Sequence, residues 1–120
     1  MNKRPKTIFL DIDGTLVEHN PPYLNSIPDM DLILLPGTLE KLLEWDKKGY
    51  NIILTTGRKE SMRDATEKQL SKLGIFYDKL LMGIGGGDRI IINDRKKDCK
   101  NNTCFAYNID RNEGIKNIDI

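Results

Sequence analysis

The feature that most constrains this chain is a pair of acids, Asp11 and Asp13, directly after a short apolar run. The run, residues 8–10, reads Ile-Phe-Leu and is typical of the end of a buried strand. Burying carboxylates is costly unless they are paired or hold a metal. Asp11 and Asp13 are two residues apart, so in a regular strand both side chains point to the same face. Gly14 then allows the backbone to turn sharply. We therefore predict that the acids converge on a cation, beside N–H groups that hold an anion.

Length and charge limit the classes of protein that this chain can belong to. Its 120 residues suffice for one domain, and a net charge of +1 gives no overall field that would attract nucleic acid or an anionic membrane. No apolar run approaches the roughly 20 residues that a membrane-spanning helix needs. Residues 1–10 do not resemble a secretion signal. We expect a cytoplasmic protein with no nucleic-acid or membrane partner, in which Cys99 and Cys104 are free thiols rather than a disulfide.

The order of secondary structure points to an α/β protein. Apolar runs alternate with segments of helical period, a pattern that favours a mainly parallel sheet. Strands are predicted at residues 7–11, 50–55, 76–82, 89–92 and 103–108, and helices at 38–48 and 61–73. The link between the third and fourth strands is only about six residues, whereas a parallel crossover normally takes a dozen or more. Either the third strand is short or irregular, or this link runs extended without a helix.

Polar residues follow three of the predicted strands. They are Asp11, then Thr55 and Thr56, then Asn93 and Asp94. In an open parallel sheet, ligands bind beyond the carboxyl ends of the strands, at the point where the strand order reverses. If the first strand lies between the second and the fourth, these polar groups meet at one edge of the sheet.

Three segments resemble motifs of the haloacid dehalogenase (HAD) superfamily, most of whose members are phosphatases. Residues 11–16, Asp-Ile-Asp-Gly-Thr-Leu, look like its first motif; residues 52–58 resemble the second and residues 90–94 the fourth. The resemblance implies a three-layer Rossmann-like domain over residues 1–120. Its mainly parallel five-stranded sheet would have the order 5-4-1-2-3. The short spacing between motifs leaves no room for a large cap domain. Capless members often act on sugar phosphates, including precursors of surface polysaccharides, or on phosphorylated macromolecules.

The resemblance also implies roles for the acids. Asp11 would be the nucleophile that forms an aspartyl-phosphate. Asp13 would protonate the leaving oxygen and then activate water. Mg²⁺ would be held by Asp11, Asp13 and Asp94, with Asn93 as a further candidate in a position that is often acidic in the family. The metal would offset the repulsion between a carboxylate and a phosphate dianion.

The phosphate-binding groups are less completely matched. Thr56 would donate to the phosphoryl oxygens with the Gly57 N–H nearby, and Thr55 takes this role if the register shifts by one. The lysine of the family's third motif has no counterpart in the loop at residues 83–88, where it is expected. Lys79 is the nearest upstream candidate, and glycine N–H groups of the loop offer an alternative. Other candidates are Arg58, Lys96 and Lys97.

Two further segments bear on the site. Residues 16–35 are irregular and leave directly from the acidic tip, so we expect a flap over the site, with His19 a solvated loop residue. Residues 111–114, Arg-Asn-Glu-Gly, are predicted to form a surface turn, and a role facing substrate or a second subunit is the alternative.

The sequence therefore predicts a Mg²⁺-dependent hydrolase of small phosphomonoesters. Two alternatives belong to other classes. One is a weakened HAD domain that binds a ligand or partner, supported by Asn93 and by the missing lysine. The other is a receiver-like domain phosphorylated on aspartate, although receivers place the acceptor on the third strand. Assembly into a homo-oligomer, which covers the site in some capless members, is left open.

Overall fold

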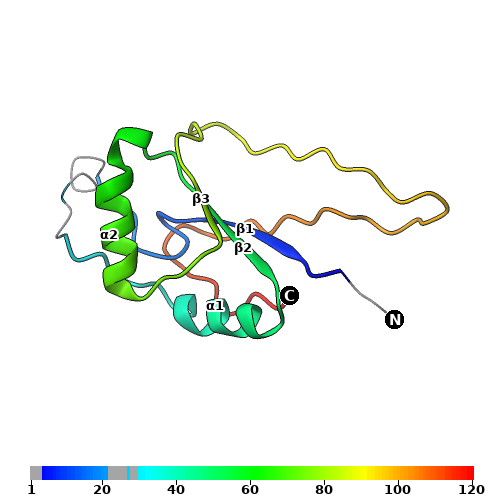
Figure 1. Cartoon of the computed structure of the whole chain (residues 1–120), viewed down its shortest axis with the longest axis horizontal. Coiled ribbons are helices and arrows are strands. Elements are labelled where there is room, and N and C mark those ends of the chain that lie inside the picture. The colour runs from blue at the N-terminus through cyan, green and yellow to red at the C-terminus, as the bar shows by residue number, and fades with distance from the viewer. Residues whose placement is uncertain (1–3, 22–26, 28–29) are drawn as a thin grey trace.

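A three-stranded parallel sheet and two helices form the body of the protein. The structure is a computed structural model that describes residues 4–21, 27 and 30–120. In chain order the elements are β1 (Thr7–Asp11), α1 (Thr38–Lys47), β2 (Asn51–Thr55), a short 3-10 turn η2 (Glu60–Met62), α2 (Arg63–Leu73) and β3 (Lys79–Leu81). Figure 1 shows the two helices beside the sheet, each connecting consecutive strands. The strands and helices of the first 81 residues thus follow the predicted order.

The register of the sheet sets which residues share the edge where the site was predicted. The order is β1-β2-β3, and Asp11 at the end of β1 lies opposite Thr55 at the end of β2, which in turn lies opposite Leu81. The 1-2-3 part of the predicted order is therefore confirmed. The third strand is shorter than predicted, with three residues instead of seven.

The core fixes this sheet against the helices. Buried side chains alternate with exposed ones along β1, whereas β2 is buried over three consecutive residues, as expected for a central strand. Trp45 and Leu42 of α1 and Leu70 of α2 are fully buried. Gly49 and Gly74 follow the two helices with positive φ angles of 78° and 80°, where an L-residue with a side chain would be strained.

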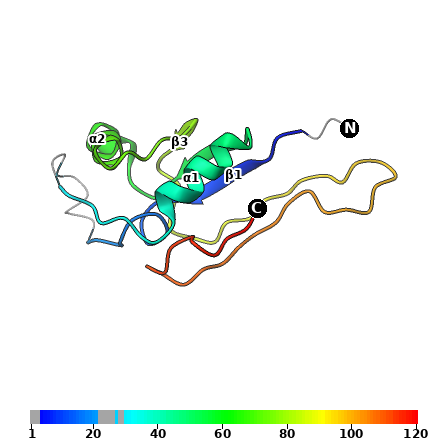
Figure 2. The same cartoon turned by 90° about the horizontal axis from the view of Figure 1, so that it is seen from below.

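The predicted fourth and fifth strands are not confirmed, because the structure has no strand at residues 89–92 or 103–108. Residues 85–108, called the arm below, are all exposed and contain no strand. Figures 1 and 2 show the arm running out from the body and back as a long extended loop. Because its two legs have no hydrogen-bonded partner strand, the apolar side chains predicted to be buried stay in solvent: Ile90 is 82% exposed and Ile92 is 93% exposed.

The end of the chain returns to the body after the arm. Ile115 is buried in the core, and its N–H donates to the Pro36 carbonyl oxygen at 3.0 Å. Ile109, Ile118 and Ile120 pack partly buried against the same core. The last twelve residues are therefore attached to the start of α1, although their sequence is mostly polar.

The predicted flap, residues 16–35, is described only in part, since residues 22–26 and 28–29 lie outside the described residues. Its two ends are held together, because Leu35 N–H donates to Leu16 carbonyl oxygen at 3.0 Å and Glu18 N–H to Ile33 carbonyl oxygen at 2.8 Å. Within the described chain, no helix has the length and apolarity needed to cross a membrane.

Candidate active site

Asp11 ends β1 and remains open to solvent. Its Oδ2 accepts a hydrogen bond from Thr15 Oγ1 at 3.3 Å, within the turn that Gly14 makes possible. Partial desolvation of the carboxylate and the nearby charge of Asp13 raise the pKa of Asp11, while Thr15, the Ile12 N–H and the charge of Arg89 lower it. The raised pKa disfavours the ionised form of Asp11, and a cation placed beside the carboxylate would favour that form.

Asp13 is paired with Arg58, which follows β2. Arg58 Nη2 lies 2.7 Å from Asp13 Oδ1, and Arg58 Nε donates to Asp13 Oδ2 at 3.0 Å. The arginine is 6% exposed. This is the two-pronged geometry that a guanidinium forms with a carboxylate, and it occupies both Asp13 oxygens.

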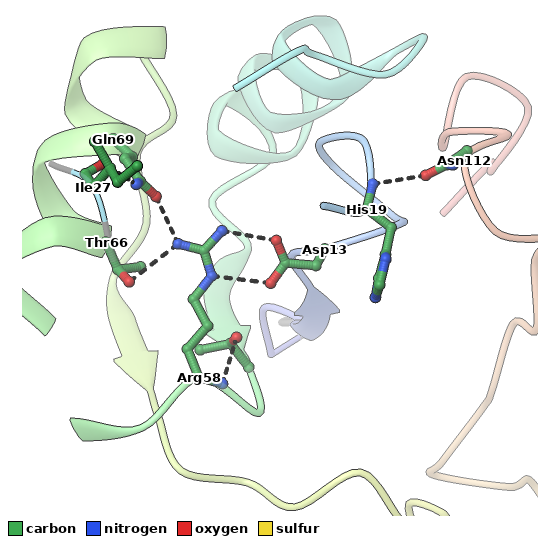
Figure 3. A network of polar contacts seen from close by, with 8 residues as sticks. Asp13, His19, Ile27, Arg58, Thr66, Gln69 and Asn112 are labelled. Atoms are coloured by element: carbon green, nitrogen blue, oxygen red, sulfur yellow. Dashed lines mark hydrogen bonds and ion pairs between the residues drawn. The ribbon is translucent and has the colours of Figure 1, made fainter. Parts of the chain in front are cut away.

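The second side of Arg58 is held by α2, as Figure 3 shows. Arg58 Nη1 donates to Thr66 Oγ1 at 3.1 Å and to Gln69 Oε1 at 2.7 Å, and Gln69 Nε2 donates to the Ile27 carbonyl oxygen at 2.7 Å. Thr66 and Gln69 are buried. Sequence reasoning missed both of them; their spacing of three residues on the buried face of a helix was the available signal.

Thr56 and Gly57 lie at the site end of β2, as predicted. Thr56 is 1% exposed, and its Oγ1 accepts a hydrogen bond from the Arg58 N–H at 3.1 Å. Thr55 Oγ1 is turned away, since it donates to the Leu10 carbonyl oxygen at 3.3 Å. A Cβ on Gly57 would lie 3.0 Å from the Ile84 carbonyl oxygen, so the glycine lets the loop after β3 pass closely. Phosphate binding by Thr56, Gly57 or Thr55 stays a prediction.

Three predicted site residues lie elsewhere in the structure. Asn93 and Asp94 are in the arm, where Asn93 Nδ2 donates to Thr103 Oγ1 at 2.9 Å and Thr103 Oγ1 donates to the Asp94 carbonyl oxygen at 2.6 Å. Lys79 opens β3 opposite Ile53, two positions before the strand ends that carry the site. Among the residues described, no three His, Cys, Asp or Glu side chains gather as a metal site. Metal binding by Asp94 and Asn93, and phosphate binding by Lys79, stay predictions.

The turn at residues 110–114 contacts the acidic loop directly. Asn112 N–H donates to the Gly14 carbonyl oxygen at 2.8 Å, and Asn112 Oδ1 accepts from the His19 N–H at 2.9 Å (Figure 3). Asn112 has a positive φ of 66°, which asparagine tolerates better than most residues. The segment predicted as a surface turn is exposed, yet it is fastened to the loop that carries Asp11 and Asp13.

Comparison with known proteins gives structural likenesses only. No protein-family model matches the sequence, and no curated protein matches it. A chain of the Pnkp1/Rnl/Hen1 complex is 31% identical over 72% of this chain and 30% of that chain, with a TM-score of 0.57. A structure of the Pnkp1/Rnl/Hen1 RNA repair complex gives 32% identity over 70% of this chain and 27% of that chain, with a TM-score of 0.56. This chain thus spans less than a third of those chains.

A crystal structure of a target protein from Vibrio cholerae shares the fold. It is 23% identical over 73% of this chain and 79% of that chain, with a TM-score of 0.53. These likenesses agree with the resemblance of the sequence motifs to the haloacid dehalogenase superfamily. The parallel sheet of β1, β2 and β3 and the two acids at the end of β1 agree with it as well. The chain therefore has a fold like that of the haloacid dehalogenase superfamily, whose motifs its sequence resembles.

Proposed function

We propose that this protein is a Mg²⁺-dependent phosphomonoester hydrolase that works through an aspartyl-phosphate on Asp11. One observation carries the proposal: an open carboxylate at the end of β1 lies at the same sheet edge as Thr56 and Gly57. Asp13, by contrast, is engaged by Arg58 through both oxygens. The two acids therefore have different environments, as a nucleophile and a proton carrier require.

In the proposed reaction, an Asp11 oxygen attacks phosphorus and the bond from phosphorus to the leaving oxygen breaks. Asp13 gives a proton to that oxygen, so the product is an alcohol and an aspartyl-phosphate. Asp13 then takes a proton from water, whose oxygen attacks phosphorus and releases Asp11 and inorganic phosphate. Since Arg58 occupies both Asp13 oxygens, one of these hydrogen bonds must open when Asp13 carries the proton.

The metal would be held by Asp11 and by the Asp13 backbone carbonyl, with Asp94 as the third protein ligand and Asn93 as a further one. Bound there, Mg²⁺ would reduce the repulsion between Asp11 and the phosphate and orient the phosphoryl group. The open Asp11 carboxylate fits a hard cation. Asp94 does not lie with it in the structure, so the proposal requires a different position of the arm.

We propose that the arm docks along β1 in the active protein. Among the described residues, β1 pairs with one strand, β2, and Phe9 on β1 is 56% exposed. The arm offers apolar residues in strand-like runs, and large exposed apolar surface is rare unless it is covered by a partner. Docked parallel to β1, residues 89–92 would form the fourth strand of the order 5-4-1-2-3 and place Asn93 and Asp94 at the site edge.

The substrate class is proposed from the resemblance and from the comparisons. No large cap domain is present in the described chain, and capless members of the superfamily often act on sugar phosphates, so a small metabolite such as a sugar phosphate is our first candidate. A terminal phosphate on RNA is the second candidate. It is supported by the 32% identity to a chain of the structure that is named as an RNA repair complex. We propose that residues 1–120 form one domain and that this domain acts in the cytoplasm.

The deciding experiment is an assay with Mg²⁺ against a panel of sugar phosphates, aryl phosphates and RNA oligonucleotides with terminal phosphates. Asp11→Asn should abolish turnover, because an amide is a poor nucleophile, whereas Asp46→Asn on α1 should leave it unchanged. Rapid acid quenching of the wild-type protein should trap phosphate on Asp11. If no substrate is turned over while ligands still bind tightly, the protein is a binding domain instead.

A further inference from the structure

The side chain of Arg111 lies across the loop that carries the two acids. A Cβ built on Gly14 would lie 3.2 Å from Arg111 Cγ and 3.9 Å from its Cδ. The aliphatic stem of the arginine therefore packs on the face of Gly14 that a side chain would occupy. His19 lies on the same side of Gly14, because its Cβ would be 3.8 Å from a Cβ built on Gly14. This contact explains why residue 14 has no side chain, in addition to its positive φ of 87°.

The position of Arg111 is fixed by its neighbours rather than by its own charge. Asn112 binds the backbone of Gly14 and His19, and Glu113 N–H closes the turn onto the Asp110 carbonyl oxygen at 3.2 Å. Gly114 passes so close to Pro36 that a side chain there would clash. A turn held at both ends keeps the backbone of Arg111 beside Gly14, where the arginine stem packs.

Among the described residues, Arg111 is also the arginine beside the acidic loop whose charge is not paired with another group. Arg58 is bound to Asp13, Thr66 and Gln69. Arg89 donates to the carbonyl oxygens of Gly85 and Gly87. Among the residues that the structure describes, Arg111 forms no ion pair, and it is exposed.

The stem of Arg111 lies on Gly14 rather than on Asp11, the acid that attacks. A guanidinium anchored on Gly14 suits an anion on the part of the substrate that leaves, because the transferred phosphoryl group would lie at Asp11. It is less suited to the phosphoryl group that is transferred.

We infer that Arg111 is a specificity residue that binds a second anionic group, phosphate or carboxylate, on the leaving part of the substrate. The inference rests on the proposed function and narrows its substrate class to phosphomonoesters with two anionic groups. A planar guanidinium binds either anion through two parallel hydrogen bonds, which a lysine cannot match.

The test compares a sugar bisphosphate with p-nitrophenyl phosphate, which has no second anion, in wild type and in Arg111→Met. Methionine keeps an apolar stem on Gly14 and removes the charge. We expect KM for the bisphosphate to rise about tenfold or more with little change in kcat, while KM for p-nitrophenyl phosphate stays the same. Arg111→Lys should lie between. Arg4→Ala removes an equal charge just before the start of β1, at the end of the strand opposite to the site. This variant should leave KM unchanged for both substrates.

The outcomes separate the inference from the function on which it rests. Equal changes for both substrates, or none, would overturn the role of Arg111. If wild type turns over neither substrate, the phosphatase proposal fails, and binding of the bisphosphate by calorimetry still tests Arg111. In the Asp11→Asn background, Arg111→Met should then weaken the affinity for the bisphosphate about tenfold without changing that for inorganic phosphate. Equal affinities with and without Arg111 would contradict the inference.

Discussion

Arg58 joins Asp13 to helix α2: its guanidinium holds Asp13 Oδ1 at 2.7 Å and Gln69 Oε1 at 2.7 Å. Asp13, the proposed proton carrier, is therefore held in place by Arg58, a buried residue that follows β2. The side chain of Arg58 is 3% exposed and that of Asp13 is 16% exposed, so this ion pair is largely shielded from water. Such a pair positions the carboxylate precisely and makes its partner hard to replace.

Arg58→Met should destabilise the protein, because it leaves Asp13 and the polar groups of Thr66 and Gln69 without their partner. Removing one member of a buried pair costs about 3 kcal/mol, which chemical denaturation can measure. Glu67→Gln removes one member of an exposed pair with Arg63 and should change the free energy of unfolding by less than about 0.5 kcal/mol.

Arg58→Lys distinguishes charge from geometry at the same position. Lysine keeps the positive charge but cannot form the two parallel hydrogen bonds to Asp13. We expect kcat to fall and its pH profile to shift, since Asp13 would carry its proton in a changed environment. A lysine variant with wild-type kcat at every pH would show that the paired geometry is irrelevant to catalysis.

Gly14→Ala should destabilise the protein for two separable reasons. The positive φ of Gly14 costs any L-residue about 1 kcal/mol, and the new methyl group would press on Arg111. Gly49→Ala is the matched control, because Gly49 has a similar φ of 78° with nothing within 4 Å of the added Cβ. The excess loss at residue 14 measures the contact with Arg111. It should shrink when Arg111→Ala is combined with Gly14→Ala, and an undiminished excess would contradict the contact.

Mg²⁺ should raise the thermal midpoint of the wild-type protein, because it binds the folded state. Asp11→Asn and Asp94→Asn should each remove most of that rise, since each deletes a proposed ligand charge. Asp98→Asn, which changes an exposed acid in the same arm, should leave it intact. Retention of the full Mg²⁺ effect in Asp94→Asn would exclude Asp94 from the metal site.

The sequence was sufficient to predict β1, β2 and both helices, because these depend on short patterns. Apolar runs, glycine stops and the turn at Gly14 act within a few residues. The Arg58 network could not be predicted in the same way. Its members, Asp13, Arg58 and Gln69, are up to 56 residues apart, and only the crossover of α2 brings them together.

The C-terminal turn illustrates the same limit. Arg111 and Asn112 carry no local pattern that would distinguish an exposed turn from one that contacts the acidic loop. Their contact with Gly14 depends on Ile115 entering the core beside Pro36, 79 residues earlier in the sequence. The predicted strands of the arm have the opposite difficulty. Their apolar pattern is clear, but a strand also needs a neighbouring strand to pair with, and in the structure no strand pairs with the arm.

Hydrogen exchange will show whether the arm docks on β1. If it does, the amides of Ile90, Ile91 and Ile92 should exchange slowly, as those of β2 do, because they would donate to a neighbouring strand. Residues 96–100 at the far end of the arm serve as the fast-exchanging reference, since they are exposed and form only turns.

Ile91→Lys should abolish this protection if Ile91 is buried on docking, while the amides of β2 remain slow. It should also lower the effect of Mg²⁺ on the thermal midpoint, because an undocked arm keeps Asp94 away from Asp11. Lys97→Ile, which alters charge and apolarity near the far end of the arm, should change neither result. Exchange of the three isoleucine amides as fast as that of residues 96–100 would mean that the arm stays extended in solution, and that Asp94 does not complete the site.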